Sequence, residues 1–235
     1  VKIAQNAAHY AVQKPDEVTD LVDFKQPEIS ATDLKAPIYI DFGPTSLSAT
    51  PWNNITSHQE SSTTSWIKDV ENNYTNIGVR VLDGFTATHA GVGSEPASPV
   101  TVDGVEFPLT AWKDGLLVKG EKNQGDVGPG RIEISQLDVA RKYNFTILAI
   151  RFNGSKDARI SSYKLVGKTE SAVKEVKTGI KDAASFAAAN FEEYIAKFEN
   201  VEPDSEGKVI VEVKGLDTGS AAEGHINALC ISLAK

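Results

Sequence analysis

The chain has 235 residues, of which 40% are hydrophobic and 24% charged, the ordinary composition of a globular protein that buries a core. Its formal net charge is -8, and the basic residues are scattered among acids, so no nucleic acid partner is expected. No apolar run approaches the roughly 18 residues of a membrane-spanning helix, so no membrane span is expected either.

Residues 1–36 differ in composition from the remainder of the chain. They hold few β-branched runs and contain two prolines, so we expect an N-terminal arm or extension here and a single domain at 37–235. The chain begins at Val1 and contains no methionine. Removal of a signal segment would leave such a start, and so would trimming of the chain.

From Ile38 onward, short β-rich runs are separated by turn signals, which is typical of an all-β sandwich. Apolar and polar positions alternate in "APIYIDFG", "NIGVRVLDG", "GRIEISQL", "RISSYKLVG" and "GKVIVEVKGL". "VTVDGVEFPL" predicts a hairpin around Asp103-Gly104, and "HINALCISLA" predicts a strand at the centre of a sheet. About eight to ten strands are expected, enough for a two-layer antiparallel β-sandwich.

The segment from Asp182 to Glu199 fits two secondary structures. Asp182 is a candidate N-cap, and Phe191, Ile195 and Phe198 follow helical spacing. Tyr194, Ala196 and Phe198 also alternate as a strand would. Periodicity favours a helix, and both alternatives stay open.

Cys230 is the only cysteine, so an intrachain disulfide is excluded. It lies in the apolar run "INALCISLA". We expect a buried thiol that packs as a small hydrophobic group rather than a nucleophile.

The stretch "IYIDFGPTSLSATPWNNITS" resembles the first strand and loop of galactose-binding-like jelly-roll domains in bacterial secreted proteins that handle polysaccharides. "NIGVRVLDGF", "ISQLDVARKYNFTILAIRFNGSKDARISSYKLVG", "VEPDSEGKVIVEV" and "GHINALCISL" follow in the order of that family, so the resemblance covers about residues 38–235. It departs from the family at "AIRFNGSKDAR", where the arginine precedes the Gly-Ser pair. It implies a jelly roll that binds carbohydrate, in a secreted, periplasmic or cell-surface protein that takes part in polysaccharide utilisation.

Sugar recognition requires an aromatic face for the ring and planar polar groups for the hydroxyls. Trp52, Asn53 and Asn54 supply both in what we expect to be a loop, with Asp41 nearby in sequence. The alternative is that Trp52 plugs the end of the sandwich while the two asparagines cap turns.

Three further residues are candidates for the ligand site. Trp112 lies beside charge and a turn, so either exposure or core packing is expected there. Arg151 and Asp157, with Arg159, surround the Asn153-Gly154 turn, where they could bind hydroxyl or carboxylate groups or tie a hairpin together by salt bridges. Trp66 is the least specific of the tryptophans and could anchor a loop.

The sequence offers little for metal binding or catalysis. The resemblance implies that a structural calcium is possible, for which Asp126, Asp204 and Glu206 are candidates, although solvated loops explain them equally. His9, His58, His89 and His225 are isolated, so no transition metal is expected. No Gly-x-Ser-x-Gly turn occurs and no feature selects a pair of catalytic carboxylates.

These features together predict a non-catalytic carbohydrate-binding module, with an oligo- or polysaccharide as ligand and other surface or secreted proteins as possible partners. A structural or protein-interaction β-sandwich without a sugar site is the alternative. An accessory domain of a glycosidase or esterase is a third interpretation.

Overall fold

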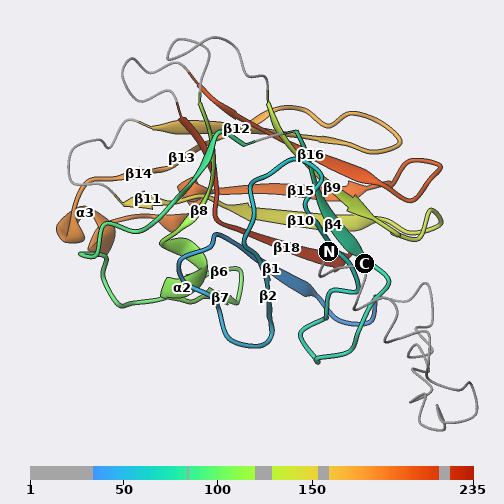
Figure 1. Cartoon of the computed structure of the whole chain (residues 1–235), viewed down its shortest axis with the longest axis horizontal. Helices are drawn as coiled ribbons and strands as arrows, with labels where there is room; N and C mark the ends of the chain where they lie inside the picture. The colour runs from blue at the N-terminus through green and yellow to red at the C-terminus, as the bar shows by residue number, and fades with distance from the viewer. Residues whose placement is uncertain (1–33, 84, 120–128, 153–158, 217–222) are drawn as a thin grey trace, which may run out of the picture.

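The computed structural model describes residues 34–83, 85–119, 129–152, 159–216 and 223–235, and its two largest sheets face each other (Figure 1). The five-stranded sheet has the order β15 (Ile195–Val201), β10 (Tyr143–Leu148), β18 (Ala228–Leu233), β1 (Ile38–Phe42), β2 (Trp52–Ile55). The six-stranded sheet has the order β13 (Lys174–Lys177), β12 (Ile160–Val166), β16 (Val209–Gly215), β9 (Gly130–Ser135), β4 (Gly78–Asp83), β3 (Thr63–Thr64). The predicted all-β sandwich is confirmed.

Pairing in both large sheets is antiparallel, with one exception: β1 and β2 run parallel. Three smaller sheets complete the described fold. They are the three-stranded sheet β17 (Glu223–Ile226), β8 (Gly115–Lys119), β5 (Ala87–His89), the hairpin β6 (Val100–Val102) and β7 (Val105–Phe107), and the pair β11 (Arg151–Phe152) and β14 (Gly179–Ile180). The hairpin turns at Asp103-Gly104, as predicted.

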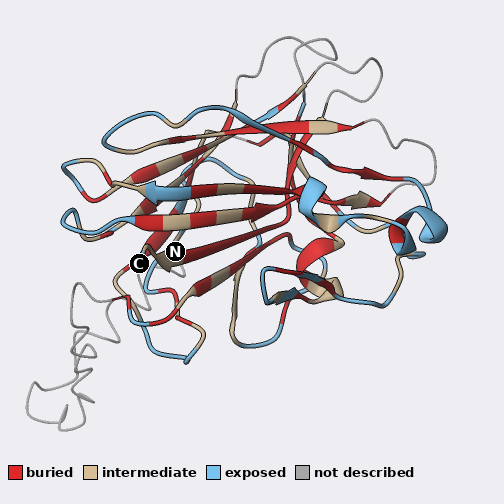
Figure 2. Cartoon of the chain, turned by 180° about the vertical axis from the view of Figure 1, so that it is seen from behind, coloured by how far each residue is buried: buried red, intermediate tan, exposed pale blue. Residues whose placement is uncertain are grey.

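The main core fills the space between the two large sheets, and strand alternation explains it. In β4, Val79 and Val81 are buried while Arg80 is exposed. In β9, Ile132 and Ile134 are fully buried between partly exposed polar neighbours. Figure 2 shows the same alternation of buried and partly exposed positions along other strands.

A second apolar cluster lies on the other face of the five-stranded sheet. It includes Trp112, Phe107, Phe186 and Tyr194, from the β6–β7 hairpin, α2 (Leu109–Trp112), α3 (Ala183–Ala187) and the 3₁₀ turn η2 (Phe191–Tyr194). β18 is buried on both faces, because Leu229 and Ile231 join the main core while Ala228 and Cys230 face this cluster. This confirms the central position predicted for the last strand and the burial predicted for Cys230.

Residues 182–199 combine both structures that their sequence allowed. Asp182 caps α3, as predicted, by accepting a hydrogen bond from the backbone amide of Ser185 at 2.8 Å. The helix ends at Ala187, and after η2 the chain continues as strand β15. The helix that periodicity favours is therefore wrong from Ile195 onward, because pairing of β15 with β10 determines the structure there.

Most of the predicted N-terminal arm lies outside the described residues. At its end, Leu34 and Ala36 are buried, and Leu34 belongs to the main core. The sandwich thus takes in residues that precede the predicted boundary at 37.

Candidate functional site

A groove of about 230 Å³ lies on the outer face of the five-stranded sheet, beside the β6–β7 hairpin. We call it the sheet groove. Its lining comes from β1, β10, β15, β18 and the hairpin, and consists of Pro37, Tyr39, Asp103, Val105, Asn144, Phe145, Thr146, Lys197, Phe198, Glu199, Cys230 and Ser232. The second apolar cluster lies on the same face and adjoins the groove, since Tyr39, Val105 and Cys230 contribute to both.

Strand register aligns the floor of the sheet groove into one row across the sheet. Lys197 pairs with Thr146, Thr146 with Cys230, and Cys230 with Tyr39. The row continues to Trp52, which pairs with Tyr39 across β1 and β2. With about 4.8 Å between neighbouring strands, these five positions span about 19 Å.

An aromatic pair forms one end of this row. The rings of Tyr39 and Trp52 lie 5.1 Å apart between centroids and are tilted by 37°, and Trp52 lies 5.7 Å from Phe107 of the hairpin. Tyr39 and Trp52 are both partly exposed. The structure thus joins the predicted Trp52 to Tyr39, which the sequence analysis did not select.

Trp52, Asn53 and Asn54 form strand β2 and not the predicted loop. The amide of Asn53 donates to the carbonyls of Tyr39 (2.9 Å) and Lys68 (2.8 Å) and accepts from the Lys68 amide (2.8 Å). The amide of Asn54 bridges the backbone of Ser48, accepting at 2.8 Å and donating at 3.0 Å. Both side chains therefore anchor backbone and hold β2, with its tryptophan, against β1.

Ion pairs form the opposite end of the sheet groove. Lys197 binds Asp103 at 2.5 Å and Glu192 at 2.6 Å, which ties the tip of the β6–β7 hairpin to β15. The hydrogen bond that Lys197 donates to Asp103, followed by the one it donates to Glu192, raises the pKa of Lys197. Thr146 and Ser232 add hydroxyl groups to the floor. The groove therefore offers an aromatic face and hydroxyl groups, and the positive charge of the lysine at its end is already balanced by two carboxylates.

A second hollow of about 460 Å³ continues the sheet groove. The two share Pro37, Asn144 and Ser232, and the second adds Lys35, Leu233 and Lys235 among its lining residues. The open surface is therefore elongated.

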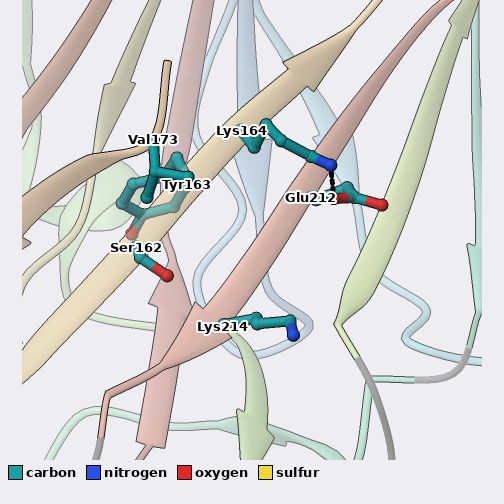
Figure 3. Close-up of a pocket in the computed structure, with 6 residues that line it drawn as sticks. All are labelled: Ser162, Tyr163, Lys164, Val173, Glu212 and Lys214. Carbon is teal, nitrogen blue, oxygen red and sulfur yellow. Dashed lines mark ion pairs between the residues drawn. The ribbon is translucent and has the colours of Figure 1, made fainter. Parts of the chain in front are cut away.

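A third hollow, on the outer face of the six-stranded sheet, is built differently (Figure 3). Lys164 reaches Glu212 at 3.1 Å, and Glu212 also binds Arg131 at 2.9 Å. Its tyrosine, Tyr163, is fully buried, so this hollow presents no aromatic face. Its lining of paired charges and one exposed aliphatic side chain, Val173, is typical of a sheet surface that faces solvent.

The lining of the sheet groove includes none of the described residues predicted to bind a ligand, which are Trp52, Asn53, Asn54, Trp112 and Arg151. Trp112 is fully buried, stacks on Phe186 at 4.9 Å and donates its indole N–H to the Ser98 carbonyl at 3.2 Å, so the core-packing alternative is the one observed. Arg151 lies on β11 and contacts His89 and Ala90. Asp157 lies outside the described residues. Trp66 is exposed to 50% of its surface, on a loop.

The calcium candidates are engaged otherwise or cannot be placed. Asp204 accepts from the amides of Glu206 and Lys208, both at 2.9 Å, and Glu206 pairs with Lys208 at 2.6 Å. Asp126 lies outside the described residues. Within the described ranges, three or more His, Cys, Asp or Glu side chains never gather in a way that could hold a metal ion.

Asp41 and Asp114 are fully buried carboxyl groups beside the loop that follows β1. Asp41 accepts from the Ser48 amide at 3.1 Å, and Asp114 accepts from the amides of Thr45 (2.7 Å) and Ser46 (3.1 Å). Burial raises the pKa of both, that of Asp41 to about 7, and the charge of Asp114 adds to the effect on Asp41. They brace the loop and do not line the sheet groove.

No protein-family model and no curated protein sequence matches the chain. Solved structures that resemble it include protein YxiM of Bacillus subtilis (12% identity, 85% of this chain and 40% of that one, TM-score 0.42). The extracellular domain of ANXUR1 from Arabidopsis thaliana is 10% identical over 66% of this chain and 40% of that one, with a TM-score of 0.43. TmCBM61 in complex with β-1,4-galactotriose is 13% identical over 63% of this chain and 90% of that one, with a TM-score of 0.31.

The chain therefore spans less than half the length of the first two of these proteins. All three TM-scores are below 0.5, and these similarities assign no function to the chain. Within the part of the chain that the structure describes, no helix has the length and apolar character needed to cross a membrane.

Proposed function

We propose that the chain is a non-catalytic carbohydrate-binding module that holds an oligo- or polysaccharide in the sheet groove. The observation that carries this proposal is the row of side chains across the five-stranded sheet, from Lys197 to the Tyr39–Trp52 pair. An aromatic face can stack on the apolar face of a sugar ring, and hydroxyl and amide groups can bind its hydroxyls.

The elongated shape of the groove favours a chain of sugar units over a single one. A neutral ligand is favoured as well, because Lys197 is already paired with two carboxylates. The neighbouring hollow at Asn144 and Ser232 would hold the continuation of the chain.

Absence of catalysis belongs to the same proposal. Glycoside hydrolysis requires two carboxyl groups that flank the scissile bond. Asp41 and Asp114, the neighbouring acids with raised pKa, are buried beneath a loop and do not face the groove. A secreted, periplasmic or cell-surface location is the one in keeping with a polysaccharide ligand.

A glycan array followed by titration of the best ligand tests the proposal. Loss of a stacking ring should cost about 1 to 3 kcal/mol, so Tyr39→Ala should weaken binding by roughly tenfold to a hundredfold. Tyr74→Ala is the matched control, because Tyr74 is exposed to 55% and does not line the groove.

Equal binding by wild type and Tyr39→Ala would show that the sheet groove is not the site. Loss of binding in Tyr74→Ala or Trp66→Ala alone would place the sugar on the exposed loop instead. Melting temperatures of the three variants are measured alongside, so that loss of binding is not confused with unfolding.

A further inference from the structure

A cluster of buried charged and polar side chains lies where β5, β11 and β17 come together. His89 and His225 are buried, and their rings meet edge to face with centroids 5.0 Å apart. Arg151 contacts His89 Nδ1 at 3.1 Å and donates to the Ala90 carbonyl at 2.8 Å. Arg159, with a side chain only 4% exposed, pairs with Glu223 at 3.2 Å.

The backbone around this cluster holds both arginines and His89 in place. The carbonyl of Thr178 accepts from the Arg151 amide at 2.6 Å, and the Thr178 amide donates to the Arg159 carbonyl at 2.9 Å. His89 pairs with Gly115 on β8, where a side chain would approach His89 Nε2 to 2.9 Å. Gly115 therefore makes room for the imidazole.

Several polar atoms in the cluster are buried without a hydrogen-bond partner. They are Nε of Arg151, Nε and Nη1 of Arg159, Nε2 of His89, Oγ1 of Thr178, and both ring nitrogens of His225, of which Nε2 lies 3.6 Å from a carboxylate oxygen of Glu223. A guanidinium group can only donate, and a buried donor left unpaired is costly. The group that would complete this cluster must therefore bring hydrogen-bond acceptors.

The charged side chains of the cluster indicate which charge the missing acceptor group should carry. Burial, followed by the neighbouring positive charges, lowers the pKa of both histidines, that of His225 to about 4, so both are neutral near pH 7. Glu95 is held by the amides of Val92 and Gly93. Among the described residues, Glu223 pairs with Arg159 and the charge of Glu95 also acts on Arg151, while the guanidinium donors named above stay unpaired, so an acceptor that carries negative charge suits them best.

We propose that this cluster is a binding site for the carboxylate group of a small organic acid, held by Arg151 and Arg159. A carboxylate supplies two acceptor oxygens and one negative charge, and its plane matches the fork of a guanidinium group. A metal cation is disfavoured because the unpaired atoms include cationic donors. Arg151 and Glu223 are partly exposed, so the cluster can be reached from solvent at those two side chains.

This site is separate from the sheet groove. Arg151 follows Thr146 of the groove floor by five residues, which is about 17 Å of extended chain. The proposed carboxylate site therefore does not depend on the proposed carbohydrate function, and the two proposals can be tested separately.

Histidine NMR of the wild-type protein is the direct test. The chain has four histidines, so their ring signals can be assigned one by one. Titration with glucuronate should shift the signals of His89 and His225 in a saturable way, while that of His58, which is not in the cluster, stays in place. Glucose and sodium chloride at matched ionic strength should shift neither signal.

Acetate is the second arm of the titration. Saturable shifts with both acetate and glucuronate would assign the site to carboxylates in general, and shifts with glucuronate alone would assign it to an acidic sugar. No saturable shift with either acid would overturn the proposal. Binding of inorganic phosphate or sulfate without binding of either acid would overturn the carboxylate assignment.

Arg159→Gln and Arg151→Gln should each weaken glucuronate binding by about tenfold or more, because each removes charge-assisted hydrogen bonds. Arg151→Gln is the safer variant, since Arg151 is partly exposed. Tyr39→Ala should bind glucuronate as the wild type does, and Arg151→Gln should keep the affinity for the array glycan. Undiminished glucuronate binding by Arg151→Gln and Arg159→Gln would rule out the two guanidinium groups as the binding groups.

Discussion

Asp41 is a fully buried carboxyl group, and burial raises its pKa from 3.8 to about 7. The folded protein therefore holds a proton that the unfolded chain releases between these two values. The contribution of Asp41 to the free energy of unfolding is most favourable below pH 3.8 and falls as the pH rises to 7. His225 has the opposite sign, because its lowered pKa lets stability rise between about pH 4 and 6.5.

The variant Asp41→Asn isolates the contribution of Asp41 to the pH dependence of stability. The amide oxygen can still accept from Ser48, and the variant carries no proton to lose. Its stability relative to wild type should increase between pH 4 and pH 7, by up to about 4 kcal/mol. Urea unfolding of both proteins at several pH values measures this, and a difference that does not change with pH would contradict it.

The tryptophans differ sharply in environment, which gives a matched pair of variants. Trp112 is fully buried against Phe186, whereas Trp66 is half exposed. Trp112→Ala should lower the free energy of unfolding by about 3 to 5 kcal/mol, and Trp66→Ala by no more than about 0.5 kcal/mol. Chemical denaturation of the two variants checks this, and similar losses in both would refute the assignment of Trp112 to the core.

At the scale of elements, the β6–β7 hairpin shapes the rim of the sheet groove. Asp103 and Gly104 both have positive φ values, 51° and 76°, as a two-residue hairpin turn requires. No atom lies within 4 Å of a side chain added at Gly104, so Gly104→Ala tests backbone strain alone.

We expect Gly104→Ala to destabilise the protein by about 1 kcal/mol. Asp103→Asn is its control, because asparagine tolerates the same turn while losing the partly exposed ion pair to Lys197, worth no more than about 1 kcal/mol. Thermal unfolding of each variant measures its loss of stability, and high salt removes only the ion-pair contribution of Asp103. Full stability of Gly104→Ala would mean that the turn has another conformation.

Elements with strong local signals could be predicted from the sequence. The alternation of Val79 and Val81 around Arg80 predicted β4, and Asp182 predicted the start of α3. The end of α3 could not be predicted, since Ile195 and Phe198 follow helical spacing too and only pairing with β10 selects the strand. Short strands such as β5 and β8 carry little local signal of their own.

At the scale of the whole molecule, strand pairing brings together residues that the sequence keeps far apart. Trp52 was selected as part of the site because a tryptophan beside two asparagines is a local pattern. Tyr39 and Lys197 reach the same groove only through the registers of β1, β18, β10 and β15. Period-two alternation could have assigned Tyr39 to the outer face, since Ile38 and Ile40 are buried, but no local signal sets the register.

The buried cluster of arginines and histidines could not be predicted from local sequence patterns either. In the sequence, Arg151 and Arg159 lie on either side of one turn, while His89 and His225 stand far from each other and from both arginines. Pairing of β5 and β17 with the two edges of β8 places both imidazoles beside the guanidinium groups. Long-range pairing of this kind is not encoded in any short segment.

A crystal structure of the protein with the glycan selected on the array would show whether the sheet groove binds carbohydrate. We expect an oligosaccharide on the outer face of the five-stranded sheet, with one sugar ring against Tyr39 and the chain directed toward Asn144 and Ser232. An oligosaccharide on the loop of Trp66 and Tyr74, or in the hollow beside Lys164 and Glu212, with the sheet groove left empty, would contradict it.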